Sequence, residues 1–199
     1  MMKIPSIFRY PGSKLKFLPV LIPYVEQQFF AAPQRFDEYV EPYFGGGAGM
    51  GVLQCLPRST RVRINDLDPG VCALWQAVQR HPEQLKAAIL KLRPTVKLFY
   101  DLKQRELKGS YTGNIVKDGL HKVVLNRLSV SGYGSKSGGP LGGRKQSNPS
   151  ARGYVRFSEV WGFRFCAPTA ALRRGSRAAI CSSATPRPPC RCGRLWGAN

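Results

Sequence analysis

Two acidic residues on either side of a glycine-rich loop carry the clearest chemistry in the sequence. Glu41 follows a short apolar and aromatic run at residues 36–40, and glycines then recur over residues 45–51. Glycine lets a backbone turn sharply and approach a ligand without a clash from Cβ. Asp66 ends a second run about twenty residues beyond the loop, where nucleotide-binding sheets place an acid that accepts hydrogen bonds from ribose hydroxyls. This joint spacing favours a site for a nucleotide-like ligand.

The charge of Glu41 narrows the class of ligand. A carboxylate at the end of a strand repels phosphate and suits a cationic or hydroxyl-bearing group. The loop also lacks the Gly-Lys-Ser/Thr ending of a P-loop, and an NAD site is disfavoured because its pyrophosphate would face Glu41. Two alternatives stay open. The glycines could form a turn that binds nothing, and Asp66 could only cap the helix that begins at Pro69, a role that suits Asp68 better.

The elements that must position these residues alternate between strands and helices. The apolar run at 36–40 and the alternating residues 61–66 predict two strands. Leu18-Pro19 predicts a helix start, because proline fits the first turn of a helix. Apolar residues recur at helical spacing in the segments 18–29, 50–56, 69–80, 82–93, 95–107 and 120–129. We therefore expect an α/β fold with a mostly parallel sheet, helices on both of its faces and a helical insert at about 82–128.

The overall charge points to a polyanionic partner. The chain has 199 residues and a formal net charge of +20, which favours nucleic acid as that partner. Neither a long apolar stretch nor a signal-peptide pattern is present, so no membrane association is expected. The six cysteines lack the spacing of a disulfide scaffold, which indicates reduced thiols and a cytoplasmic location. His81 and His121 have no partner at metal-ligand spacing, so no metal site is predicted.

A glycine-rich segment at residues 131–146 is the strongest candidate for contact with nucleic acid. Its glycines are interleaved with Lys136, Arg144 and Lys145. A mobile, basic loop of this kind can follow a phosphate backbone, while an arginine or glutamine reaches the edges of bases. A solvated linker is the alternative.

Several blocks occur in a family-specific order. They read Arg-Tyr-Pro-Gly-Ser-Lys at 9–14, Glu-Pro-Tyr-Phe-Gly at 41–45, Ile-Asn-Asp at 64–66, and Leu-Asn-Arg followed by Ser-Gly at 125–132. No single block is specific, but the ordered set resembles the Dam-type family of DNA adenine methyltransferases over roughly residues 5 to 150. The resemblance implies a Rossmann-like methyltransferase fold. It also implies transfer of a methyl group from S-adenosylmethionine to the exocyclic amine of adenine in double-stranded DNA.

The resemblance also implies which residues bind the cofactor. In such enzymes the first block and the glycine loop hold S-adenosylmethionine, and the acid after the second strand binds its ribose. Carried over to this sequence, Tyr10, Lys14, Gly45 and Asp66 would contact the cofactor, with Glu41 close by.

For DNA, the resemblance implies a second set of residues. The stretch around Asn126 and Arg127 leads into the segment that holds and reads DNA in this family. We therefore expect a methyltransferase domain at residues 1–150, with a cofactor-binding part at 1–80 and a DNA-recognition insert at 82–150.

One departure from the family pattern concerns catalysis. The Asp-Pro-Pro-Tyr motif expected after the DNA-reading segment is absent. Its polar groups accept hydrogen bonds from the target amine, and its aromatic ring stacks on a flipped-out adenine. Attack of the amine on the methyl group then needs positioning more than acid–base chemistry. The sequence Asn148-Pro149-Ser150 lacks the aromatic ring and comes too early, so no catalytic residue is predicted.

The composition changes sharply near residue 150. Residues 151–199 contain nine arginines, no lysine and one acidic residue, Glu159. Our hypothesis is an out-of-frame reading of GC-rich DNA after a frameshift, and the alternative is a genuine basic tail that binds nucleic acid. We expect an irregular tail that cannot complete the sheet, and a methyltransferase that is truncated and inactive as written. A non-catalytic, basic DNA-binding module is the competing function.

Overall fold

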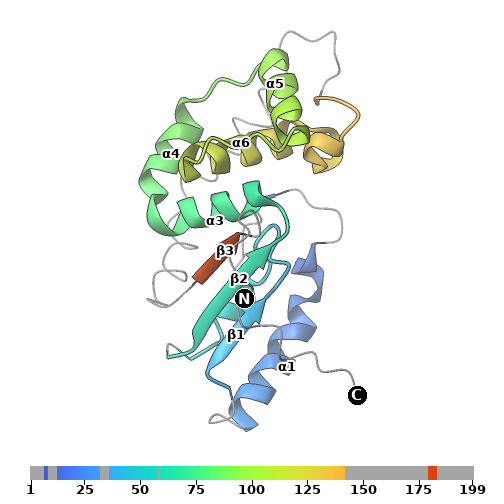
Figure 1. Ribbon diagram of the computed structural model, residues 1–199. Helices are drawn as coiled ribbons and strands as arrows, with labels where there is room; N and C mark the ends of the chain where they lie inside the picture. The colour runs from blue at the N-terminus through green and yellow to red at the C-terminus, as the bar shows by residue number, and fades with distance from the viewer. Residues whose placement is uncertain (1–6, 9–12, 32–35, 58, 142–178, 183–199) are drawn as a thin grey trace, which may run out of the picture.

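The computed structural model describes residues 7–8, 13–31, 36–57, 59–141 and 179–182. These residues form a mixed α/β structure with more helix than strand. A small parallel sheet occupies the lower half of Figure 1, and a layer of helices lies beyond the ends toward which its strands run.

The sheet contains three parallel strands among the described residues, in the order β1-β2-β3. They are β1 (Glu38–Glu41), β2 (Arg61–Asp66) and β3 (Ala179–Ser182). The first two are the strands that the apolar runs predict, although β1 lies further toward Glu41 than the run at 36–40. Parallel pairing places Glu41 level with Ile64, so both strands end at the same edge of the sheet.

Strand β3 corrects the expectation of a wholly irregular tail. Asn65 and Asp66 of β2 are level with Cys181 and Ser182 of this strand. Four residues are too few to show a period of two, so the sequence carried no usable signal for a strand. The pairing arises because β2 offers a second edge of backbone N–H and C=O groups.

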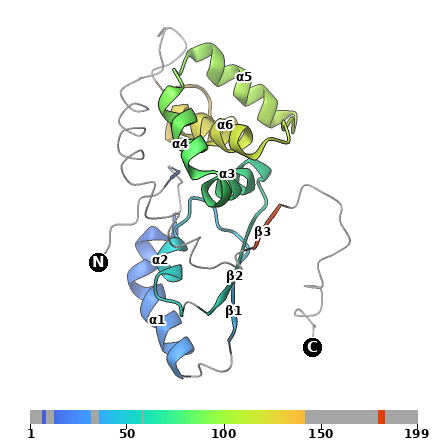
Figure 2. The same ribbon diagram turned by 90° about the vertical axis from the view of Figure 1, so that its left-hand side faces the viewer.

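Helices cover one face of the sheet in the described residues. A short 3-10 helix, η1 (Lys14–Phe17), leads into α1 (Leu18–Ala31), and α2 (Met50–Leu53) follows the glycine loop. Figure 2 shows α1 and α2 on the same side of the strands. Val40 of β1 is 50% exposed. The fuller sheet with helices on both faces is therefore not seen in the part of the chain that the structure describes.

Four helices form the layer beyond the sheet. They are α3 (Pro69–Arg80), α4 (Pro82–Lys91), α5 (Val96–Leu107) and α6 (Ile115–Leu128), followed by the 3-10 turns η2 (Val130–Gly132) and η3 (Gly134–Lys136). The helical periodicity of residues 69–129 is thus confirmed. Side chains cap three of these helices at their N-termini, namely Asp68, Thr95 and Asn114. No helix of the described residues is long and apolar enough to cross a membrane.

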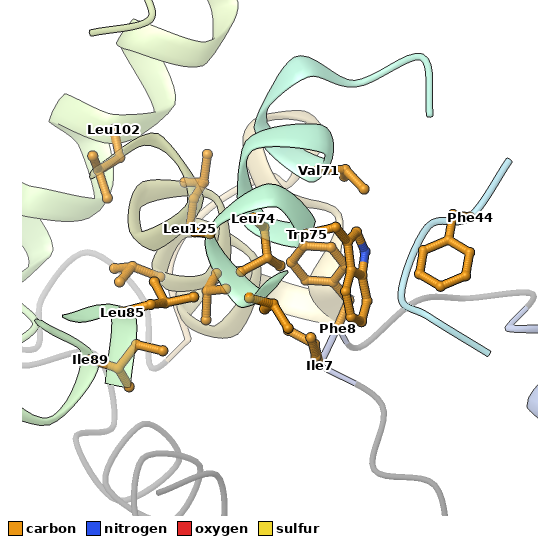
Figure 3. Packing of buried hydrophobic residues seen from close by; sticks show 14 of the residues in the cluster. Ile7, Phe8, Phe44, Val71, Leu74, Trp75, Leu85, Ile89, Leu102 and Leu125 are labelled. Carbon is orange, nitrogen blue, oxygen red and sulfur yellow. The ribbon is translucent and has the colours of Figure 1, made fainter. Parts of the chain in front are cut away.

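The hydrophobic core lies mainly between these helices. Figure 3 shows Leu74 and Trp75 of α3 at its centre, with Leu125 of α6 on one side. The two helices approach very closely, because a Cβ added at Gly119 would lie 2.7 Å from the Cα of Leu74. Ile7, which precedes the first described helix, is fully buried in the same cluster. The core therefore ties the N-terminal segment to the helical layer.

Candidate functional site

The carboxyl ends of β1 and β2 bring the predicted acidic residues together. Glu41 pairs with Ile64, so Asp66 lies just beyond it on the neighbouring strand. The loop between Glu41 and α2 is fastened across these ends by two hydrogen bonds. The Phe44 N–H donates to the Asn65 carbonyl over 2.9 Å, and the Gly45 N–H donates to Asp66 Oδ2 over 2.7 Å.

The glycines of this loop serve two different purposes. A Cβ at Gly47 would lie 2.3 Å from the Trp75 ring, and one at Gly49 would lie 1.8 Å from Glu41 Oε2. These two glycines let the loop pack closely against Trp75 and Glu41. Gly45 shares a positive φ with Gly47 (+52° and +81°), but it is different because nothing lies within 4 Å of its Cβ position. Gly45 therefore has both the left-handed backbone that favours glycine and open space beside it.

Trp75 is a support that the sequence did not reveal. Its indole Nε1 donates to the Gly45 carbonyl over 2.9 Å, and its ring meets Phe44 edge-on with centroids 4.9 Å apart. The helical pattern of residues 69–80 marks this position as core, which is correct, since Trp75 is 2% exposed. No local signal indicates that a core tryptophan also holds the loop.

The carboxylate of Glu41 has a partner at each of its two oxygens. Its side chain is 8% exposed, and the Lys14 ammonium lies 2.5 Å from Oε1. The Tyr39 hydroxyl donates to Oε2 over 2.9 Å, and burial together with Glu41 raises the pKa of Tyr39 well above its usual range. Lys14 also donates to the Tyr43 carbonyl over 2.7 Å and remains 43% exposed. Glu41 thus holds Lys14 at the loop, while the lysine side chain as a whole stays partly exposed.

Asp66 and Asp68 divide the roles that the sequence left open. Asp68 caps α3, because Oδ1 accepts from the N–H groups of Gly70 and Val71. Asp66 is not the cap. It holds the turn before α3 by accepting from the Asp68 N–H over 3.0 Å, while its other oxygen accepts from Gly45. A carboxylate has about four lone-pair sites, so Asp66 can still accept from a ligand.

The residues expected to contact DNA differ in their burial and in whether the structure describes them. Asn126 is 5% exposed and donates to the Gly132 carbonyl over 2.6 Å. Arg127 donates from Nε to the Ile7 carbonyl over 2.9 Å. Both hold backbone segments in place here, and direct contact with DNA stays a prediction for them. Lys136 lies exposed in η3. Tyr10, Arg144 and Lys145 lie outside the described residues.

The described half of the glycine-rich segment is not an open loop. The Ser129 hydroxyl accepts from the Gly134 N–H over 3.0 Å. Ser129 and Pro140 form a bridge, and the Leu141 N–H donates to the Leu128 carbonyl over 2.7 Å. These contacts fold residues 129–141 back onto the end of α6, so this part of the segment forms turns and not an extended loop. Its glycines made the segment look open, but Gly132 and Gly134 have positive φ and form turns.

The arrangement at the strand ends defines a class of protein. Parallel strands that end in a glycine loop and an acidic residue are typical of α/β proteins that bind nucleotide-like ligands at the carboxyl edge of the sheet. No group of three potential metal ligands occurs within the described ranges.

The chain belongs to the D12 class N6 adenine-specific DNA methyltransferase family, whose model matches residues 10–135. The match covers well over half of the chain and confirms the resemblance noted from the ordered blocks. It includes every proposed cofactor residue and ends just before Lys136. No curated protein matches the chain significantly.

Proposed function

We propose that the edge formed by Glu41, the glycine loop and Asp66 binds S-adenosylmethionine. The observation that carries this proposal is the 2.7 Å hydrogen bond from the Gly45 N–H to Asp66 Oδ2. This bond places an open glycine beside an acid that still has acceptor capacity. When bound, S-adenosylmethionine would supply a methyl group activated on a sulfonium. The protein's part is to bind and orient it.

Each residue of this edge has a role that suits the ligand's chemistry. Asp66 would accept hydrogen bonds from the ribose hydroxyls, and the space beside Gly45 would let the ligand approach the backbone. The half-exposed Lys14 would face the cofactor's carboxylate, while Glu41 holds that lysine in position. Tyr10 would complete the set as the family resemblance implies.

DNA is the substrate that membership of the family implies, and double-stranded DNA is our proposal. The formal net charge of +20 would attract the phosphate backbone. Lys136 is exposed in the glycine-rich segment at residues 131–146, and Arg144 and Lys145 follow it in the sequence. We assign phosphate contacts to these three residues, and a cytoplasmic location remains our prediction.

Calorimetry on the full chain tests the cofactor site. Asp66→Ala should weaken S-adenosylmethionine binding by about 1–3 kcal/mol, because ribose hydrogen bonds are lost. Asp66→Asn keeps an acceptor for the Gly45 N–H and separates loss of charge from collapse of the loop. The matched control is Asp37→Ala, which removes an exposed carboxylate before β1 that pairs with Arg61. Absence of binding heat with wild type would refute the proposal and favour the non-catalytic DNA-binding module.

A further inference from the structure

A buried lysine joins the turn after β2 to the helical layer. The Lys122 side chain on α6 is 12% exposed. Its ammonium pairs with Asp68 Oδ2 and lies 3.1 Å from Glu106 Oε2 on α5. Burial alone would lower the pKa of Lys122, but the two carboxylates outweigh it and raise that pKa above its ordinary value. Lys122 is therefore a charged bridge between two acidic residues.

The bridge reaches the proposed cofactor site at one end. Asp68 donates its backbone N–H to Asp66 Oδ1 over 3.0 Å, and the other oxygen of Asp66 holds Gly45. A displacement of the Asp68 turn would therefore move both acceptor oxygens that define the ribose side of the site.

The same bridge reaches the glycine-rich segment at its other end. Glu106 Oε1 accepts from the Ser135 hydroxyl over 2.6 Å. Ser135 lies in η3 next to Lys136, to which we assign a phosphate contact. Lys103, on the same helix as Glu106, donates to the Ser137 carbonyl over 2.7 Å. Helix α5 thus holds Ser135 within η3 and Ser137 just after it, and Lys122 pairs with Glu106.

Two glycines make the bridge geometrically possible. A Cβ at Gly70 would lie 3.0 Å from Lys122 Cδ, so the lysine stem passes directly over the start of α3. Gly119, one turn before Lys122 on α6, lets this helix contact the backbone of Leu74. The small residues thus bring α6 close enough to α3 for the ammonium to reach Asp68.

From this geometry we infer that Lys122 is a positioning residue that couples the cofactor site to the DNA-binding segment. The inference rests on the proposed function and deepens it. Binding of S-adenosylmethionine would order the Asp68 turn and, through Lys122 and Glu106, hold η3 in its DNA-binding position. DNA would favour cofactor binding by the same factor, because coupling between two binding sites is reciprocal.

The test measures S-adenosylmethionine affinity of the full chain by calorimetry, alone and with a saturating mixed-sequence duplex. Wild type should bind the cofactor at least about fivefold more tightly with DNA, the lower end of typical coupling. In Lys122→Met the ratio of cofactor affinity with DNA to cofactor affinity without DNA should fall to near one. Lys122→Arg keeps a cation between the two carboxylates and should retain most of the ratio. A residue that only stabilised the fold would lower both affinities without changing their ratio.

Three further variants separate loss of coupling from misfolding. Lys117→Met removes an exposed cation from the same helix and should leave the ratio unchanged. Glu106→Gln and Ser135→Ala cut the path without removing Lys122, and each should lower the ratio. Unchanged coupling in folded Lys122→Met, or no coupling in a wild type that binds both ligands, overturns the inference alone. A wild type that binds no cofactor overturns the proposed function and the inference with it.

Discussion

Helices α1 and α3 differ in a way that their sequences do not suggest. Helix α1 is the more apolar of the two, yet Leu18 is its one buried residue, and Val20 and Tyr24 are 73% and 61% exposed. Helix α3 buries eight of its twelve residues. The difference arises because α3 packs along α6, whereas α1 contacts the short α2 and η1. Burial here follows from the packing partner and not from apolar content.

The comparison extends to the two halves of the molecule. The helical layer is a packed core with its own polar bridge, and it carries most of the hydrophobic stabilisation of the described residues. The sheet half carries the proposed cofactor edge with fewer buried contacts. The predictions below test this contrast.

The largest expected effect is the absence of methyl transfer. The purified 199-residue chain should transfer no detectable methyl group to adenine-containing DNA, because the Asp-Pro-Pro-Tyr motif that would hold the adenine is absent from the sequence. Incorporation of label from S-adenosylmethionine measures this, with an active member of the family as positive control. Robust methylation would mean that another group holds the adenine. Reading the encoding DNA in the other two frames beyond codon 150 tests the frameshift hypothesis independently.

Truncating a side chain on α3 should cost more stability than truncating one on α1. Leu74→Ala should lower the free energy of unfolding by about 2–5 kcal/mol, because the Leu74 side chain of α3 is fully buried in the core. Val20→Ala on α1 should change it by about 0.5 kcal/mol or less. Urea denaturation measures both variants. Comparable losses of unfolding free energy in the two variants would show that the exposed face of α1 is buried in solution, and would contradict the difference between the two helices.

Within the sheet half, the loop should be sensitive at Gly49. Gly49→Ala places a methyl group against the Glu41 carboxylate. Overpacking of this kind costs about 1–3 kcal/mol, and it should weaken cofactor binding by disturbing Lys14. Gly138→Ala is the control, since it has open space and no positive φ. Thermal unfolding and calorimetry report the two effects. A stable Gly49→Ala variant with wild-type affinity would show that the loop has room that the structure lacks.

The smallest expected effect concerns salt dependence. Replacing Lys136, Arg144 and Lys145 with alanine should flatten the slope of log affinity for DNA against log salt by up to about three units, roughly one for each lost phosphate contact. Fluorescence anisotropy at several salt concentrations measures the slope. Lys117→Ala on α6 serves as a surface control. An unchanged slope in the triple variant would mean that the glycine-rich segment is a linker that does not contact phosphate.

The sequence predicted the helices of the core well because the signals for them are local. Apolar periodicity and capping residues such as Asp68 lie within the segment they specify. The adjacent ends of β1 and β2 also followed from two short runs and the rule for parallel strands. Glu41 and Asp66 were predicted from their spacing around the glycine loop, and Lys14 and Gly45 from the family resemblance. The structure brings these four residues to one edge.

The features that were missed depend on contacts between distant segments. Lys122 looks like any helical lysine, because its partners Asp68 and Glu106 are brought to it only by packing of α3 and α5 against α6. The pairing of residues 179–182 with β2 likewise joins segments far apart in the chain. The family block that contains Asn126 likewise carries no signal for its bond to the Gly132 carbonyl, because that bond depends on how the following turn folds.

The contact between Trp75 and the glycine loop makes this residue a built-in optical reporter. The indole is buried, bonded to the Gly45 carbonyl and edge-on to Phe44, so its emission should respond to any shift of the loop. The chain has three tryptophans. Replacing Trp161 and Trp196 with phenylalanine would leave Trp75 as the sole indole. Stopped-flow fluorescence of that variant would follow ligand entry at the strand ends in real time, without a label.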